Sequence, residues 1–173
     1  MRRQFVFVSL LIALVTTTTL WWTRPQARAA ASTSPTQAIM QPDLPQPTPE
    51  LTPSEVVRIQ LDALQHNDQP GSEDGVKTAW NFASPGNKQA TGPLPRFIRM
   101  VHNPTYEQMI DHRQHRLGQL KLVNQRIAVV NAILTAADGT PAYFQFQLSR
   151  QEGGPYDGCW MTDAVLPLKG DFI

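Results

Sequence analysis

Cysteine is almost absent from this chain, because Cys159 is the single cysteine among 173 residues. One cysteine excludes a disulfide framework within the chain, and it also excludes a zinc cluster built on cysteines. A free cysteine packs as a small apolar residue, so we expect Cys159 to be buried next to Trp160. Pairing between two chains is the less favoured alternative, and a homodimer stays open.

The chain also lacks an excess of charge of either sign. Its formal net charge is +1, divided into +2 for residues 1–52 and −1 for residues 53–173. Without a basic stripe, a nucleic-acid partner is not expected. There is no glycine-rich phosphate loop, and Ser84 lacks the Gly-x-Ser-x-Gly surroundings of a serine nucleophile. We therefore predict no cofactor and no nucleotide or serine-hydrolase chemistry.

The first 29 residues are typical of an export signal. Two arginines precede an apolar run over residues 5–15, and Ala-Arg-Ala at residues 27–29 offers a cleavage site. A cleaved signal peptide fits this short run. An uncleaved membrane anchor fits if residues 5–22 form one span with two tryptophans at the lipid interface. Both alternatives predict an exported protein, either anchored in a membrane or released into a periplasm or thylakoid lumen.

Residues 30–51 are rich in serine, threonine, glutamine and proline, and this composition predicts a disordered linker. If the anchor is retained, the linker is a stalk of up to roughly 70 Å that holds the following domain away from the membrane. If it is cleaved, the linker is a disordered leader. The folded domain is expected over residues 52–170.

The domain should begin with a helix. Thr52 is a good N-cap, Pro53 occupies the first helical position, and Glu55 completes a capping box. Apolar residues follow at helical spacing until a polar stretch begins after residues 66–67. The spacing predicts one buried stripe along this helix.

Two further helices are expected over residues 75–82 and 95–101, and residues 106–113 are expected to add one or two helical turns. Residues 80–101 combine large apolar side chains with three prolines and two glycines. Ordinary helices do not tolerate so many helix breakers, and ordinary loops do not carry so much apolar surface. This stretch therefore predicts a packed corner of turns and short helices, rather than a binding loop.

The second half of the domain has the period of strands. Residues 127–135 are apolar on both faces and predict a strand covered on both sides. Asp138 and Gly139 indicate a hairpin turn, after which apolar and polar residues alternate from residue 142 to residue 148. A last strand is expected over residues 158–166. Helices followed by an antiparallel sheet define an α+β fold, with the N-terminal helices packed on the sheet.

Six blocks in this order resemble the family called domain of unknown function 4864, and the ending at residues 158–163 resembles its cyanobacterial and plant plastid branch. The resemblance covers residues 53–168 and implies the cone-shaped fold of nuclear-transport-factor-2-like proteins, with helices across a strongly bent sheet. It implies no catalytic residues. The blocks are residues 57–61, 82–85, 97–101 with Tyr106, 138–139, 148–151 and 158–160.

A fold of this kind encloses a pocket between helices and sheet, where polar groups on apolar faces are candidates for chemistry. Asn131 and Asp163 share strand faces with apolar residues, and a buried Asp163 would have a raised pKa suited to proton transfer. The favoured alternative is that Asn131 satisfies a backbone group and Asp163 caps a helix or faces water. The predicted pocket residues are Trp80, Phe97, Tyr106, Asn131, Trp160 and Asp163; the aromatic ones are more simply explained as core.

Residues 111–116 contain His112 and His115, which would share a helix face and could bind a metal with Asp111 or Asp163. A third histidine at ligand spacing is missing, and the neighbouring arginines would repel a cation. We therefore favour a solvated basic loop.

Two functions fit the sequence. The leading hypothesis is an exported, non-catalytic module that binds a protein or a small apolar ligand and contacts a membrane through residues 5–22 if these are uncleaved. The alternative is a small isomerase, dehydratase or cyclase, with Asp163 as general base and Tyr106 or His102 as proton donor. The alternative rests on fold analogy alone.

Overall fold

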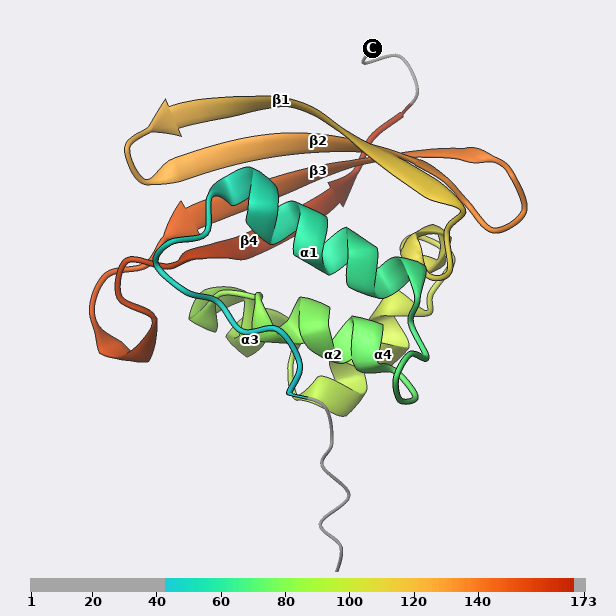
Figure 1. Ribbon diagram of the computed structural model, residues 1–173, viewed down its shortest axis with the longest axis horizontal. Coiled ribbons are helices and arrows are strands. Elements are labelled where there is room, and N and C mark those ends of the chain that lie inside the picture. Colours follow the sequence, from blue (N-terminus) through green and yellow to red (C-terminus); the bar gives the residue numbers. More distant parts are fainter. Residues whose placement is uncertain (1–42, 170–173) are drawn as a thin grey trace, which may run out of the picture. The chain divides into compact units, whose positions relative to one another are not determined.

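The computed structural model describes residues 43–169 of the chain (Figure 1). Four α-helices come first, and a four-stranded antiparallel sheet with the order β1-β2-β3-β4 follows them. This arrangement confirms the predicted α+β class. The elements are α1 (Pro53–Gln65), α2 (Asp74–Asn81), α3 (Pro85–Thr91), α4 (Leu94–Val101), η1 (Glu107–Met109), β1 (Gln114–Asn124), β2 (Ile127–Thr135), β3 (Pro141–Arg150), η2 (Gly154–Tyr156) and β4 (Trp160–Pro167).

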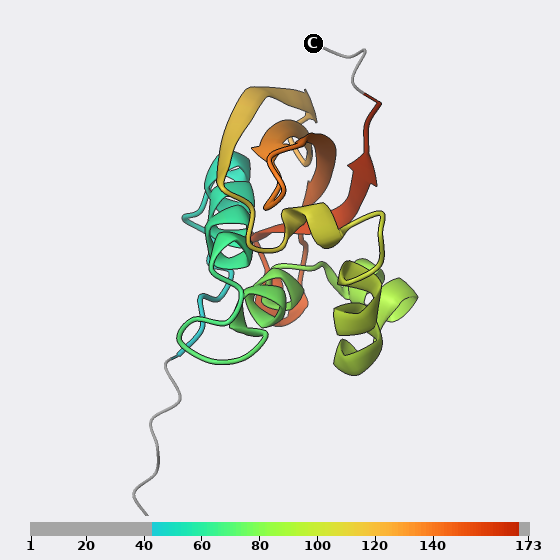
Figure 2. The same ribbon diagram turned by 90° about the vertical axis from the view of Figure 1, so that its right-hand side faces the viewer.

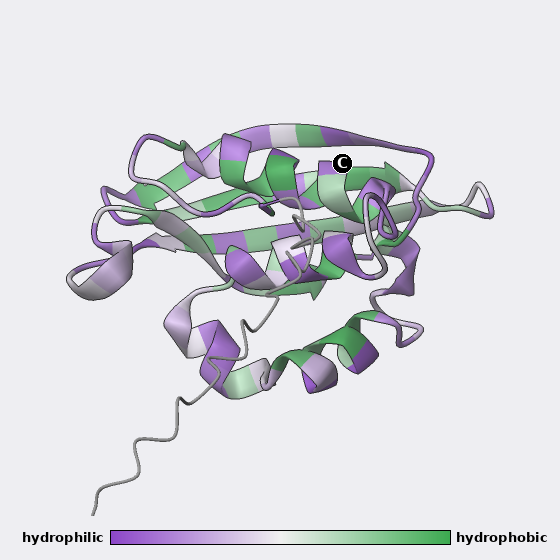
Figure 3. Cartoon of the chain, turned by 60° about the horizontal axis from the view of Figure 1, so that its bottom comes forward, coloured by the Kyte–Doolittle hydropathy of each residue, from purple (hydrophilic) through white to green (hydrophobic). Residues whose placement is uncertain are grey.

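The helices gather on one side of the sheet, and among residues 43–169 the opposite face carries no helix (Figure 1, Figure 2). The alternation of apolar and polar residues along the strands, visible in Figure 3, turns one face of each strand toward the helices. The buried strand residues are Ala128, Val130, Ala132 and Leu134 of β2, Ala142, Phe144, Phe146 and Leu148 of β3, and Met161 and Thr162 of β4.

The bounds of β2 agree with the sequence prediction, but the expected cover on both of its faces was wrong. Val129 and Ile133 lie on the face away from the helices and are only partly buried. Their branched side chains suit a half-buried strand surface as well as a core, so composition alone does not separate the two cases.

Helix α1 forms as the sequence predicts. The Thr52 hydroxyl accepts a hydrogen bond from the Glu55 amide at 3.3 Å, and the Thr52 amide donates to the Glu55 carboxylate at 2.7 Å. Four apolar residues of α1 are buried almost completely in the core between helices and sheet: Val56, Val57, Leu61 and Leu64.

The corner at residues 80–101 contains one helix more than expected. Helix α2 already ends at Asn81, and Pro85 starts α3, with Ser84 as the N-cap that accepts a hydrogen bond from the Asn87 amide at 3.2 Å. Proline suits the first helical position, where its missing N–H would have no partner inside the helix. The predicted corner of short helices is confirmed, and the loop expected between the second and third helices is itself helical.

Strand β1 is absent from the sequence prediction. Its alternation is broken where Gly118 and Gln119 together face the single residue Asn131 of β2, which makes a β-bulge. The bulge changes which residues face the helices halfway along the strand, so no single two-residue period runs through it.

Residues 43–51, part of the segment predicted as a linker, lie against the domain. The Asn81 side-chain amide donates to the Pro45 carbonyl at 3.2 Å, and Leu51 packs on the hydrophobic core. The predicted signal or anchor and residues 30–42 lie outside the described residues. No helix between residues 43 and 169 is both long enough and apolar enough to span a membrane.

Gly75 brings α2 close to α1. A Cβ atom at Gly75 would collide with the Ala63 carbonyl oxygen and would lie 2.8 Å from the Asn67 Cα atom. Both obstacles belong to the backbone, so they cannot move aside as a flexible side chain could. The Gly75 amide in turn donates a hydrogen bond to the Asn67 carbonyl at 2.9 Å. This hydrogen bond requires the two backbone segments to lie close together.

We expect Gly75→Ala to lower the free energy of unfolding by about 1–3 kcal/mol, because α2 must move away from α1 to make room for the methyl group. Urea unfolding followed by circular dichroism measures the change. Gly86→Ala is the matched control, since a Cβ atom there meets only the Ser84 hydroxyl at 3.9 Å. The control should be neutral or stabilising by about 0.4–1 kcal/mol. Equal midpoints for the two variants would contradict the close-approach argument.

Candidate functional site

The most promising site is a cavity of about 290 Å³ between the helices and the β4 edge of the sheet. All four helices contribute to its wall, together with β3, β4 and the segment around η1. The wall is mainly apolar. Its apolar residues include Leu64, Phe97, Met100, Met109, Phe146 and Val165.

Helix α4 packs on α2, and α3 contacts β4. Phe97 of α4 lies against Trp80 of α2, with ring centroids 5.1 Å apart, and the Asn87 side chain of α3 donates to the Thr162 carbonyl of β4 at 3.0 Å. Figure 2 shows α3 and α4 on the far side of α2 from α1. The side chains that would fill this corner in a closed core line the cavity instead.

One point of attachment holds β4 to the helices. The Ser84 amide donates to the Thr162 carbonyl at 2.8 Å, and the Thr162 amide donates to the Phe82 carbonyl at 2.9 Å. These two hydrogen bonds form a short parallel bridge between the α2–α3 junction and β4. The cavity begins directly beside this bridge, where Thr162 is one of its wall residues.

Gln60 and Thr162 are the polar residues of the wall that are almost completely buried. The Gln60 Nε2 atom donates to the Val56 carbonyl at 3.0 Å and to the Thr162 hydroxyl at 2.9 Å. Neither residue was among the predicted pocket residues. Gln60 did carry a signal, since it is a polar residue on the apolar stripe of α1, between Val57 and Leu64.

Three of the six predicted pocket residues do line the cavity: Phe97, Tyr106 and Asp163. The Tyr106 hydroxyl donates to the Val165 carbonyl at 3.2 Å. Asp163 is the extra residue of a β-bulge in β4, because Thr162 pairs with Leu148 while Ala164 pairs with Gln147. The bulge leaves Asp163 exposed at the rim, so the burial from which a general base was argued is not present.

The other three predicted pocket residues lie elsewhere. Trp80 stands behind Phe97, and Trp160 packs on the core without lining the cavity. Asn131 points away from the helices and lines a hollow on the opposite face of the sheet, where its side-chain oxygen accepts from Gln145 at 3.2 Å. The expected meeting of Asn131 and Asp163 in one pocket is therefore corrected, because the two strand faces are opposite.

His102, the second proposed proton donor, caps the end of α4 and is exposed. Its Nε2 atom lies 2.9 Å from a carboxylate oxygen of Glu73. This pair joins α4 to the loop before α2, and His102 does not line the cavity.

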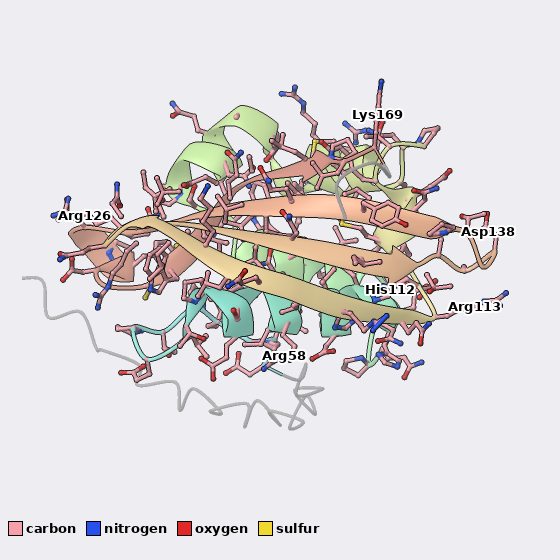
Figure 4. The ribbon with its side chains drawn as sticks, turned by 90° about the horizontal axis from the view of Figure 1, so that it is seen from above. Arg58, His112, Arg113, Arg126, Asp138 and Lys169 are labelled. Carbon is pink, nitrogen blue, oxygen red and sulfur yellow. The ribbon has the colours of Figure 1, made fainter. Side chains whose placement is uncertain are left out.

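Residues 111–116 do not form a solvated basic loop, and His112 and His115 do not share a helix face. His112 is 1% exposed, and His115 lies in β1. Figure 4 shows His112 where β1 lies over α1, whereas Arg113 points outward. His112 is buried by a long-range contact with α1, and the local run of charged residues did not indicate this contact. Among residues 43–169, no three histidine, cysteine, aspartate or glutamate residues are grouped so that they could hold a metal ion.

The two histidines form a hydrogen-bonded chain. The Nδ1 atom of His112 lies 2.8 Å from the Met109 carbonyl, and its Nε2 atom lies 2.8 Å from Nδ1 of His115. A carbonyl oxygen only accepts, so neutral His112 donates from Nδ1 and accepts at Nε2 from His115. On its other side, Nε2 of His115 lies 3.5 Å from the Asp62 carboxylate. Burial lowers the pKa of His112 below its usual 6.5, and burial also lowers the pKa of His115.

Below pH 6.5 the unfolded chain binds more protons at these two sites than the folded chain, so the free energy of unfolding should fall as the pH drops through this value. We expect His112→Asn to lose part of this dependence, because the asparagine amide can still donate to Met109 but does not titrate. Urea unfolding between about pH 7.5 and about pH 5 measures the slope.

His66→Gln is the control for this experiment, because His66 is exposed at the end of α1. It should change the slope less than His112→Asn does, because His66 is the smallest of the influences that lower the pKa of His112. An unchanged slope in His112→Asn would show that the buried histidine does not govern stability in this pH range.

Comparison with known proteins gives one match. The family model described as domain of unknown function (DUF4864) matches residues 48–170 of the chain. No curated protein and no solved structure is similar enough to this chain to count as a match. The cone-shaped fold implied by the resemblance and its cyanobacterial and plant plastid branch therefore stay predictions.

Proposed function

The chain belongs to the family described as domain of unknown function (DUF4864), and we propose that it is a module that binds a small apolar ligand between its helices and β4. The observation that carries this proposal is the cavity of about 290 Å³. Protein interiors are normally packed so that few voids exceed the size of one water molecule. The cavity is close to the lower end of ligand pockets, which start at about 300 Å³.

The composition of the wall supports binding without chemical conversion. Every buried side-chain nitrogen and oxygen among residues 43–169 has a hydrogen-bond partner. The Tyr106 proton is donated to the Val165 carbonyl, and His102 is paired with Glu73 outside the cavity. The enzyme alternative needs a protected base beside an available proton donor, whereas Asp163 is exposed and Tyr106 is engaged.

We also propose that the module is exported, as the first 29 residues indicate. Residues 5–22 would anchor it in a membrane if they are retained, and cleavage after residue 29 would release it. N-terminal sequencing of the protein recovered from its source distinguishes the two alternatives, because a chain starting at Ala30 carries no anchor. A protein confined to the cytoplasm with its first residues intact would contradict both.

The binding proposal predicts that benzene, a small apolar probe, enters the cavity of the full chain. Carbon-13 labelling of the methionine methyl groups provides the measurement, because Met100 and Met109 line the cavity, whereas buried Met161 does not. Benzene should shift the Met100 and Met109 signals in a saturable way and leave the Met161 signal in place.

Ala90→Trp should weaken this binding by about tenfold or more, because the indole occupies the cavity mouth. Gln89→Trp is the matched control, since Gln89 is the next residue on α3, is also exposed and does not line the cavity. Met100 and Met109 signals that do not respond to benzene in the unaltered chain, or an equal loss of binding in both variants, would overturn the proposal.

A further inference from the structure

The hydrogen-bonding groups and the charge around the cavity restrict what can occupy it. Asp163 is the only residue of the wall that carries a charge at neutral pH. Its carboxylate forms no hydrogen bond or ion pair with any of residues 43–169 that would neutralise it, and the bulge in β4 holds it at the exposed rim. An anionic group entering the cavity would meet this carboxylate without a compensating cation.

The donors of the wall are mostly occupied. The Tyr106 hydroxyl donates to the Val165 carbonyl, and the Thr91 hydroxyl donates to the Asn87 carbonyl at 2.8 Å. Both hydrogens of the Gln60 amide are in use, one on the Val56 carbonyl and one on the Thr162 hydroxyl. A ligand therefore finds few protein hydrogens to accept.

The acceptors of the wall are largely available. The Gln60 side-chain oxygen accepts only from the Thr162 hydroxyl, at 3.3 Å, and a carbonyl oxygen has two lone pairs. The Tyr106 hydroxyl oxygen also keeps its lone pairs, since it acts as a donor toward Val165. Together with both oxygens of Asp163, these atoms can accept hydrogens from a ligand. A single amide hydrogen of Asn87 is the remaining donor, because its other one is donated to the Thr162 carbonyl at 3.0 Å.

Basic residues near the cavity do not reverse this balance. Lys88 is directed elsewhere, with its ammonium group donating to the Asn81 carbonyl at 3.1 Å and lying 5.1 Å from the Tyr156 ring centroid. Arg96 and Arg99 are exposed on α4 and do not line the cavity.

We infer that the ligand has an apolar body and a cationic, hydrogen-bond-donating end, such as a protonated primary amine, which lies at the Asp163 rim. The apolar body occupies the part of the cavity between Phe97, Met109 and Phe146. A fatty-acid carboxylate is disfavoured, because its head group would bring a second negative charge and two more acceptors. This inference rests on the proposed function and names the chemical class of ligand that the cavity selects.

Three probes with the same six-carbon chain test the inference at neutral pH: hexylamine, hexanol and hexanoate. Each is titrated into the full chain, and the methyl signals of Met100 and Met109 report entry into the cavity. We expect hexylamine to bind at least about fivefold more tightly than hexanoate, with hexanol between them, because opposite charges at about 4 Å attract weakly even in water. The difference should narrow as salt is added.

Asp163→Asn should abolish the preference for hexylamine, because it removes the charge and keeps the shape of the side chain. Glu152→Gln is the matched control, since it removes one carboxylate that is paired with Arg126 away from the cavity. It should leave the preference unchanged.

The outcomes separate the two proposals. Equal binding of the three probes to the unaltered chain would overturn the charge preference and leave the ligand-binding function in place. A preference that survives in Asp163→Asn would overturn the assignment to Asp163. If none of the probes and not even benzene shifted Met100 or Met109, the proposed function itself would fail.

Discussion

The two backbone hydrogen bonds of Thr162 are the constraint on which the cavity depends. They fasten β4 to the junction of α2 and α3, through Phe82 on one side and Ser84 on the other. The Gln60 side chain binds the Thr162 hydroxyl from α1, so three helical segments meet one residue of one edge strand. Helix α1 packs on β1, β2 and β4, and α3 contacts β4 near Thr162. The cavity lies beside this point, between the helices and β4.

The sequence predicts well those elements whose signals are local. The capping box at Thr52 and Glu55 needs only residues three apart, and the Asp138–Gly139 turn fixes the hairpin of β2 and β3. Local signals do not predict the structure correctly where a contact with a distant part of the chain determines it. His112 is surrounded by charged residues in sequence and is buried only because β1 crosses α1, and β1 itself loses its period at the Gly118 bulge.

The distinction between local signals and distant contacts also explains which site residues could be predicted from the sequence. Phe97 and Tyr106 were predicted as pocket residues or as part of the core, because large aromatic side chains are visible in any sequence. For Asp163 the sequence left two alternatives, a buried general base or the favoured residue that faces water, and the exposed Asp163 agrees with the second. The bulge that turns it outward leaves no trace in composition. Gln60 was overlooked although its position on the apolar stripe of α1 made it unusual. A polar residue in such a stripe indicates a partner arriving from elsewhere in the chain.

The bulges in β1 and β4 also affect whether another chain can add a strand to the sheet. Both strands are edges of the sheet, and an edge strand with regular spacing is a template on which another chain can add itself. In β1 the ladder is interrupted at Gly118, and in β4 it is interrupted at Asp163, whose charge faces outward. The irregularity that shapes the cavity rim therefore also breaks the straight row of amides and carbonyls that uncontrolled sheet extension requires. In β4, the interruption of the edge and the geometry of the cavity rim arise from the same extra residue.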